Sequence, residues 1–524
     1  MAAELTDTEH REFSKRLAPN MVTNVIRTVL TAMIGLLLVP YYIGELGSAV
    51  YAILPLATSV TSYVLVVSDE ITNAFSRYLV ISIHRNDREE ANRVYTTTII
   101  GLGKTVFAIA PIVAIVSFVS PYVFQIGPSS AASVQTMFIM ILSSALMISF
   151  SACFNSIYTA FNKMYVLYAV RSIYIILQVV LIICFFVVAG PSLEMIGLAY
   201  VISGAVFFVM VRVSSRRLCP TLRIDRRLYD RKLLKEMGSV GIWTVLSRIG
   251  LLMLIQASLI MVNLFLGTEE QTGFSIVATM ISMTNTACIT ITTVIAPFLY
   301  RSYADGNREN LVKISKTSMK FVGLLIAFPI AFLCVFSPQV LTAWVGESYT
   351  YLSETVLIMF PIQLAVCAAG VLEVIPILYL KIRSVALFTL SVGAMNILSA
   401  AAVLAFTDTG TVGVAIVWTL AMFVLNVLFY PYSIAKMTSS GPGTFLKPMI
   451  PGHIALAMCI AAGWLASHFV AMPPTWTAIL LVFFLAYAVY IVAALSLGLS
   501  REDKNRIRGA MPRSVVKIIP RWML

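Results

Sequence analysis

Residues 165–189 read YVLYAVRSIYIILQVVLIICFFVVA and hold a single charged side chain, Arg171. A helix of about 20 apolar residues crosses a hydrocarbon core roughly 30 Å thick. The run does not alternate between polar and apolar residues at period two, and a backbone in lipid must satisfy its own hydrogen bonds. Residues 165–189 therefore predict a transmembrane helix.

Runs of the same kind recur along the chain, which predicts an all-α polytopic membrane protein with about 14 transmembrane helices. Of the 524 residues 59% are hydrophobic and 12% are charged, whereas soluble domains carry roughly 25% charge. This composition excludes a soluble enzyme, a nucleic-acid-binding protein and a disordered scaffold. The spans are expected at about 21–43, 49–82, 96–118, 132–157, 165–189, 194–213, 239–266, 273–300, 317–338, 354–379, 384–406, 411–434, 449–470 and 475–499.

The short segments between the runs carry charge of opposite kinds on alternate sides. With the N-terminus inside, the inside segments hold Arg85, Arg88 and Arg93, Lys163, the stretches 212–235 and 301–320, Lys381 and Arg383, Lys436 and Lys447, and the tail 501–521. The outside segments hold no Lys or Arg but carry Glu45, Glu194, Glu269, Glu270, Glu347 and Asp408. Basic residues stay on the cytosolic side, so we expect a cell (inner or plasma) membrane protein with both termini in the cytosol.

The chain also resembles itself at an offset of 220 residues. Leu46-Gly47 matches Leu266-Gly267, and residues 86–90 (NDREE) match 306–310 (GNREN). Two parallel six-helix repeats are typical of transporters, with the substrate site between the halves. The expected parts are a cytosolic N-terminal segment (1–20), a first lobe (21–213), a basic linker (214–238), a second lobe (239–434), two additional helices (449–499) and a basic tail (500–524).

Basic residues inside the spans are the leading candidates for a binding site, because an ionisable group at membrane depth is expensive unless it faces water or a partner. Arg27 and Arg248 lie at corresponding positions of the two repeats, 221 residues apart, and Asn24 and Thr31 share a helical face with Arg27. A guanidinium group matches phosphate oxygens in a bidentate way. We interpret the two arginines as an anion clamp, with Lys104 as a further cation; the alternative is that these side chains extend to the lipid headgroups.

Acidic residues inside the spans are candidates for coupling transport to an ion gradient. Asp69 and Glu70 point about 100° apart on one helix, and Asp69 is the one that shares a polar face with Ser62, Asn73 and Ser76. Each either binds H⁺ or Na⁺ or forms a salt bridge, for which Arg77 and Arg27 are possible partners. Glu373 lies within two turns of Lys381 and has the same two interpretations.

The sequence predicts no metal site, no organic cofactor and no disulfide framework. The seven cysteines form no Cys-x-x-Cys pair, and the four histidines are scattered. The tail 513–524 alternates basic and apolar residues, including Lys517 and Arg521, and with the linker it is expected on an anionic membrane surface or to serve only for orientation.

The start of the chain resembles a known family. Residues 39–55 (VPYYIGELGSAVYAILP), 68–71 (SDEI) and 75–78 (FSRY) are similar to the polysaccharide-transporter, Wzx-type branch of the multidrug/oligosaccharidyl-lipid/polysaccharide (MOP) exporter superfamily. That branch usually has Leu-Gly where this chain has Glu70-Ile71, and Gly where it has Ala52. The resemblance covers roughly the first twelve spans.

The resemblance implies a V-shaped bundle with alternating access. It also implies a lipid-linked glycan as the substrate, moved on its polyprenyl diphosphate from the cytosolic to the outer leaflet, and a glycan polymerase or assembly complex as a possible partner. Two alternatives keep the fold: a cation-coupled multidrug or metabolite exporter, and a lipid II flippase. A membrane enzyme is disfavoured because the longest outside loop (337–351) has no Arg or His.

Overall fold

A computed structural model describes residues 7–85, 87–469 and 472–504, and within these ranges the chain is helical with no β-strand. Within these ranges fourteen helical stretches are long and apolar enough to cross a membrane, which confirms the predicted fold class. The predicted spans match these stretches one for one, with ends that differ by up to nine residues, most of all at Arg88–Val123 and Arg308–Val345. The basic tail positions Lys517 and Arg521 lie outside the described residues.

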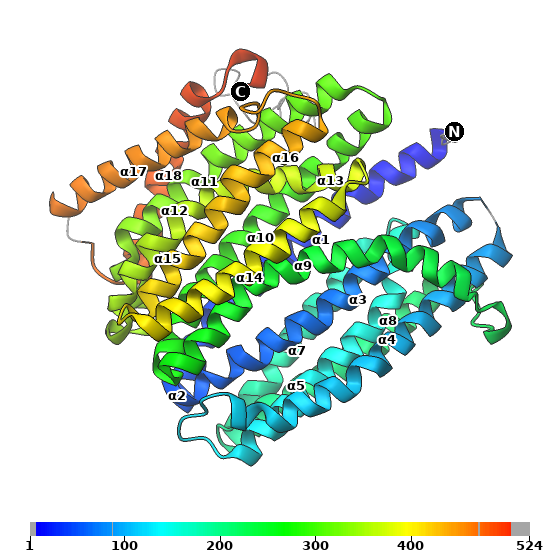
Figure 1. Ribbon diagram of the computed structural model, residues 1–524, viewed down its shortest axis with the longest axis horizontal. Helices are drawn as coiled ribbons and strands as arrows, with labels where there is room; N and C mark the ends of the chain where they lie inside the picture. The colour runs from blue at the N-terminus through cyan, green and yellow to red at the C-terminus, as the bar shows by residue number, and fades with distance from the viewer. Residues whose placement is uncertain (1–6, 86, 470–471, 505–524) are drawn as a thin grey trace. The chain divides into compact units, whose positions relative to one another are not determined.

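Several spans consist of two helices joined end to end, such as α2 with α3 and α12 with α13 (Figure 1). The helices are α1 (Asp7–Leu46), α2 (Ser48–Tyr51), α3 (Ile53–His84), α4 (Arg88–Val123), α5 (Ala131–Ser151), α6 (Asn155–Ala160), α7 (Met164–Ala189), α8 (Leu193–Leu218), α9 (Arg231–Leu266), α10 (Thr268–Ala304), α11 (Arg308–Val345), α12 (Ser353–Gly370), α13 (Ile375–Leu378), α14 (Ile382–Phe406), α15 (Gly410–Phe423), α16 (Tyr430–Met437), α17 (Ile450–Phe469) and α18 (Trp476–Gly498).

The chain forms two compact units. Unit 1 comprises Met1–Leu252 and Asn263–Thr272, and unit 2 comprises Met253–Val262 and Gly273–Leu524. Helices α9 and α10 therefore contribute residues to both units. The domain limits expected from the sequence remain a prediction.

The backbone repeats its unusual conformations at the offset seen in the sequence. Gly47 (φ 82°, ψ 157°) and Gly267 (φ 95°, ψ −172°) both lie in a region of backbone space that is essentially restricted to glycine. Each follows a long helix and starts the next one, so the same turn is built twice. Three glycine pairs with positive φ are spaced by 219 or 220 residues: Gly47 and Gly267, Gly127 and Gly346, Gly190 and Gly410.

Helix starts are repeated in the same way. Asp87 caps α4 by accepting a hydrogen bond from the Glu90 amide at 3.0 Å, and Asn307 caps α11 by accepting one from the Asn310 amide at 2.9 Å. Short polar side chains at this position satisfy one of the open amides of the first turn. The matching residues 86–90 and 306–310 thus encode equivalent helix starts.

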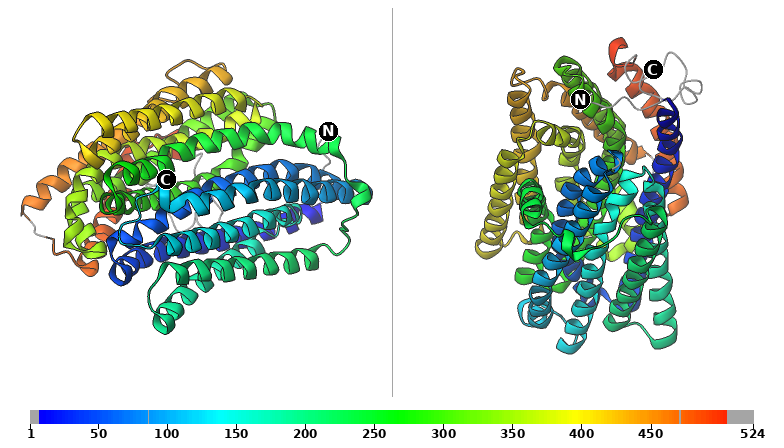
Figure 2. Two further views of the ribbon diagram at one scale, coloured as in Figure 1. Left: turned by 60° about the horizontal axis from the view of Figure 1, so that its bottom comes forward. Right: turned by 90° about the vertical axis from the view of Figure 1, so that its right-hand side faces the viewer.

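The core of unit 1 lies where α3, α4 and α6 meet α8. Figure 2 shows the blue to cyan helices of this unit lying side by side. Phe75, Leu102 and Tyr158 are almost completely buried there. The Tyr158 hydroxyl donates to the Val211 carbonyl of α8 at 3.0 Å. A buried phenol normally needs such a partner, so this bond fixes α6 against α8.

In unit 2, α11 supports the two C-terminal helices. Gly452 of α17 lies so close to Gly323 that a β-carbon on Gly452 would meet the Gly323 backbone at 3.0 Å. Small residues allow helix backbones to approach in this way in membranes. The second C-terminal helix, α18, is hydrogen-bonded to α11: the Tyr490 hydroxyl donates to the Leu324 carbonyl at 2.6 Å.

The end of α18 is attached to α11 by Asp503. Its carboxylate accepts from Thr317 at 2.7 Å and from Lys320 at 3.0 Å. Burial opposes ionisation of Asp503, but the hydrogen bonds from Thr317, Lys320 and Ser500 together lower its pKa to about 2. A carboxylate with a lowered pKa loses its stabilising effect only as the pH falls from about 4 toward 2, so this contact persists at neutral pH.

Two cysteines are joined, contrary to the prediction of no disulfide framework. Cys288 of α10 and Cys367 of α12 form a disulfide with a Cα–Cα distance of 5.5 Å. They are 79 residues apart in the sequence. Cysteine spacing carries no information on such a pair, because only the packing of the two helices brings the residues together.

Candidate functional site

Arg27 lies on α1 within a candidate membrane span and is partly buried. Its Nε and Nη2 donate to the Asn24 Oδ1 at 3.3 and 3.0 Å, and its guanidinium carbon lies 5.6 Å from the centre of the Tyr168 ring on α7. Asn24 accounts for two of the five N–H groups of the guanidinium. Asn24 and Tyr168 therefore hold the guanidinium in one orientation.

Arg171 joins this group from α7, one turn after Tyr168. It interacts electrostatically with Arg27 and with Asp69 of α3. Two guanidinium groups and one carboxylate thus come together from α1, α3 and α7. Arg171 was not among the site residues predicted from the sequence; the i, i+3 spacing of Tyr168 and Arg171 on one helix face was the available signal.

The second carboxylate of α3 serves a different cation. Glu70 Oε1 lies 3.5 Å from Arg248 Nε on α9, with 18% of the Glu70 side chain and 47% of the Arg248 side chain exposed. Asp69 and Glu70 therefore face different partners, as the 100° rotation between neighbouring helix positions requires. Arg248 belongs to the part of α9 that clusters with unit 1.

The charges of this group do not cancel. Arg27 and Arg171 supply two positive charges and Asp69 supplies one negative charge, while Glu70 and Arg248 balance each other. One positive charge remains in excess, on helices that are otherwise strongly apolar. Such a group favours an anion, and guanidinium groups are suited to phosphate oxygens.

The polar residues near Arg27 on α1 form hydrogen bonds with different partners. Thr31 is exposed, and its hydroxyl donates to the Arg27 carbonyl at 2.9 Å. Asn20, one turn before Asn24, donates to Asn162 Oδ1 at 2.8 Å and accepts from the Tyr165 amide at 2.8 Å. Asn20 thus fastens α1 to the start of α7, which places Arg27 beside Tyr168.

Lys104 of α4 contacts the basic linker. Its Nζ donates to the Tyr229 hydroxyl at 3.0 Å and lies 4.2 Å from the centre of the Tyr229 ring. The structure therefore gives Lys104 a cation–π partner on the linker. Its predicted role in an anion clamp remains a prediction.

The linker itself is held on the first part of α4. The Arg223 amide donates to Asn92 Oδ1 at 2.8 Å, and Asp230 forms an ion pair with Arg93. Hydrogen bonds from the Leu233 amide, which α9 provides, and from Arg93 keep the pKa of Asp230 below its usual range. Asp230 thus caps α9 and ties it to α4.

The remaining candidates are not brought into this group by the described contacts. Arg77 is exposed on α3. Glu373 lies in unit 2, in a 3-10 turn (Val371–Val374) between α12 and α13. Their predicted roles in ion coupling remain predictions.

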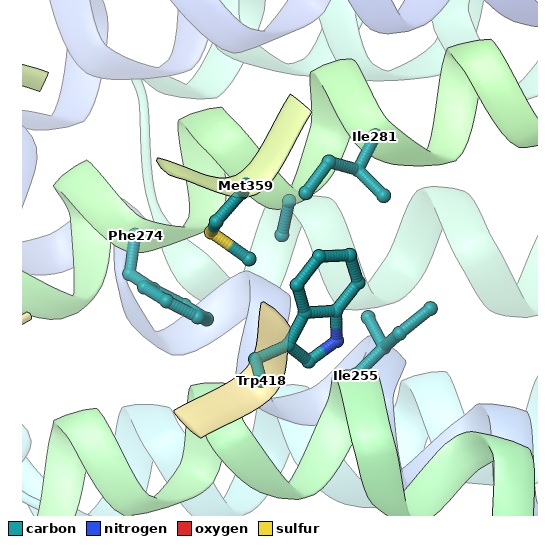
Figure 3. A pocket seen from close by; sticks show the side chains of 6 residues that line it. Ile255, Phe274, Ile281, Met359 and Trp418 are labelled. Atoms are coloured by element: carbon teal, nitrogen blue, oxygen red, sulfur yellow. The ribbon is translucent and has the colours of Figure 1, made fainter. Parts of the chain in front are cut away.

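A small enclosed cavity in unit 2 is unsuited to substrate. It has a volume of about 10 Å³ and is surrounded by apolar side chains, among them Phe274, Met359 and Trp418. Figure 3 shows the Met359 and Trp418 side chains filling the space between the helices. A space this small is a packing gap, since it holds at most about one water molecule.

Comparisons with known proteins identify the family and the fold. Residues 17–303, more than half of the chain, match the family model described as polysaccharide biosynthesis protein. The uncharacterized membrane protein EpsK of Bacillus subtilis (strain 168) is 21% identical over 491 residues, which cover 93% of this chain and 96% of that protein.

Three solved structures share the fold. The lipid II flippase MurJ in an inward closed conformation has a TM-score of 0.62 at 15% identity, over 91% of this chain and 97% of that one. A multidrug resistance MATE family transporter of the MOP superfamily, inward-facing, has a TM-score of 0.62 at 15% identity, over 84% and 98%. A MOP superfamily transporter from Pyrococcus furiosus Vc1 has a TM-score of 0.60 at 16% identity, over 85% and 96%. Identities this low show the fold alone.

Proposed function

We propose that this chain, which belongs to the polysaccharide biosynthesis protein family, is a flippase for a polyprenyl-diphosphate-linked oligosaccharide. It moves this lipid from the cytosolic to the outer leaflet of the cell membrane by alternating access, with both chain termini in the cytosol. The family and the shared MOP transporter fold support a flippase or exporter in general. The cargo is inferred from the charged group in unit 1.

The single observation that carries the proposal is the pair Arg27 and Arg171 beside Tyr168. The guanidinium groups of Arg27 and Arg171 repel each other. The negative charge of a bound diphosphate would offset that repulsion. Arg27 is already oriented by Asn24, so little side-chain entropy is lost when it binds. The diphosphate is common to all such lipids, whatever sugar they carry.

Asp69 offers a route to coupling. It competes with the diphosphate for Arg171. Uptake of H⁺ or Na⁺ by Asp69 would change the charge next to Arg171. In an antiport cycle Asp69 binds the ion from outside after the lipid has been released there, and releases it to the cytosol before the next lipid binds, so the inward ion gradient drives the lipid outward.

A leaflet assay in vesicles with defined lipid-linked glycans tests the proposal. Arg27→Ala and Arg171→Ala should each lower the flipping rate by at least about tenfold, because hydrogen bonds to charged groups contribute about 1.5–3 kcal/mol. Arg27→Lys should retain more activity than Arg27→Ala, because lysine keeps the positive charge and loses only the bidentate hydrogen bonds of the guanidinium group. Asp69→Asn should abolish the effect of a proton or sodium gradient.

The matched control is Arg216→Ala, which removes an exposed charge from the last turn of α8 and should leave flipping unchanged. Normal flipping by both Arg27→Ala and Arg171→Ala would reject the proposal. A glycan polymerase or assembly complex that receives the product is a further expectation, open to co-purification.

A second candidate is a cation-coupled exporter of drugs or metabolites. Asp69 favours it, because an exposed carboxylate on a membrane helix suits a cationic cargo. Export of a cationic dye that survives Arg27→Ala and is lost in Asp69→Asn would support this alternative. A lipid II flippase would instead require the same arginines and would accept lipid II in the leaflet assay.

A further inference from the structure

A wide apolar groove lies on unit 2, between α12, α15 and α17. Its volume is about 720 Å³, in the range of pockets that hold drug-sized molecules. Pro361 of α12 and Phe423 of α15 line one side, and Ile450, Ile454 and Ala457 of α17 line the other. The residues lining the groove include neither Arg27, Arg171 and Asp69 nor those of the small cavity shown in Figure 3.

An irregular helix shapes one wall of the groove. Residues Val424–Phe429 form a π-helical segment directly after α15, and Val427 of this segment lines the groove. A π-turn contains an extra residue and is frequent at functional sites. The Thr419 hydroxyl donates to the Ile358 carbonyl of α12 at 3.2 Å, so α12 and α15 form one continuous surface.

The groove opens toward the side where α17 presents apolar side chains. Ile450 and Ile454 are 53% and 55% exposed, and Phe423 is 42% exposed. Around a membrane-spanning helix such side chains meet lipid rather than water. The natural occupant of an apolar groove open to lipid is therefore a hydrocarbon chain.

One end of the groove is cationic. Lys447, just before α17, is exposed and lines the groove together with His453. His453 shares a helix face with Ile450 and Ala457. Its Nδ1 donates a hydrogen bond to the Met449 carbonyl at 2.8 Å, which leaves Nε2 as a hydrogen-bond acceptor for a ligand. None of the described residues lining the groove is acidic.

We propose that this groove is a binding site for an anionic phospholipid. One acyl chain lies between α12, α15 and α17, the headgroup phosphate meets Lys447, and His453 Nε2 accepts a hydrogen bond from a headgroup hydroxyl group. Charge complementarity selects an anionic headgroup over a neutral one, because a lysine near the membrane surface attracts anionic lipid by about 1 kcal/mol. The bound lipid connects the base of α17 to α12 and α15.

Native mass spectrometry of the full-length protein tests the site, with phosphatidylglycerol and phosphatidylethanolamine as probes. Lys447→Gln should weaken phosphatidylglycerol binding about fivefold and leave phosphatidylethanolamine binding unchanged. Ala457→Phe, which fills the groove, should weaken binding of both lipids. The controls are Lys436→Gln, which removes an exposed lysine at the end of α16, and Ala462→Phe, which enlarges an exposed α17 residue outside the groove.

The two controls should bind both lipids as the unchanged protein does. Equal losses in Lys447→Gln and Lys436→Gln would overturn the proposal, because the lysine would then act only through general charge. Unchanged phosphatidylglycerol binding in Ala457→Phe would also overturn it. So would displacement of phosphatidylglycerol by a lower concentration of polyprenyl phosphate, since the groove would then belong to the carrier lipid.

Discussion

At the scale of single residues, the two neighbouring carboxylates on α3 interact with different arginines. Asp69 faces Arg171, whereas Glu70 pairs with Arg248. The sequence predicted the divergence of the two side chains but named Arg77 and Arg27 as possible partners. A helix wheel gives directions only; which helix lies in each direction is a matter of packing.

The Glu70–Arg248 pair is the first prediction at this scale. Glu70→Gln and Arg248→Gln should each lower the melting temperature, and the double variant should lose less than the sum. We expect a coupling of about 0.5–1 kcal/mol, because Arg248 is nearly half exposed and such pairs are weak. Additive losses in a double-mutant cycle would show that the pair does not contribute to stability.

At the scale of elements, the turns after α1 and α9 depend on glycine. Gly47→Ala and Gly267→Ala should each destabilise the protein by about 1–3 kcal/mol, because a β-carbon is strained in this conformation. Neither crowding nor burial is involved at Gly47, where a β-carbon would meet no other atom within 4 Å. Thermal unfolding in detergent measures the effect.

Gly44→Ala is the matched control for Gly47→Ala. Gly44 lies three residues earlier in α1, is helical and also has free space around it. The substitution should be neutral or slightly stabilising, because alanine favours the helix. Equal melting temperatures for the Gly44 and Gly47 variants would contradict the assigned turn.

The contact between α11 and α17 gives another prediction at this scale. Gly452→Ala should separate α17 from α11, because the new β-carbon would meet Gly323 backbone atoms that cannot move aside. Gly323→Ala is the milder partner variant, since its β-carbon would lie 3.7 Å from the nearest atom, in ordinary contact. Hydrogen exchange in α17 should rise in the first variant and change little in the second.

At the scale of the whole molecule, the charge asymmetry predicts orientation. Cysteines placed singly in a background without native cysteines, at Glu45 and at Asp408, should react with an impermeant thiol reagent added outside cells. Cysteines placed at Arg217 and Arg301 should react only after the membrane is made permeable. The reverse pattern at any one position would change the number of spans before it.

The sequence by itself determined the fold class, because a polar backbone and charged side chains are so costly in hydrocarbon that the 14 apolar runs admit only spanning helices. It also revealed the repeat, through Gly47 and Gly267 and through the caps Asp87 and Asn307, since these are local conformations. Tertiary structure alone decided that Arg171 joins Arg27 and Asp69, that Cys288 meets Cys367, and that α12, α15 and α17 leave a groove. Those contacts join residues far apart in the chain, and only helix packing brings them together.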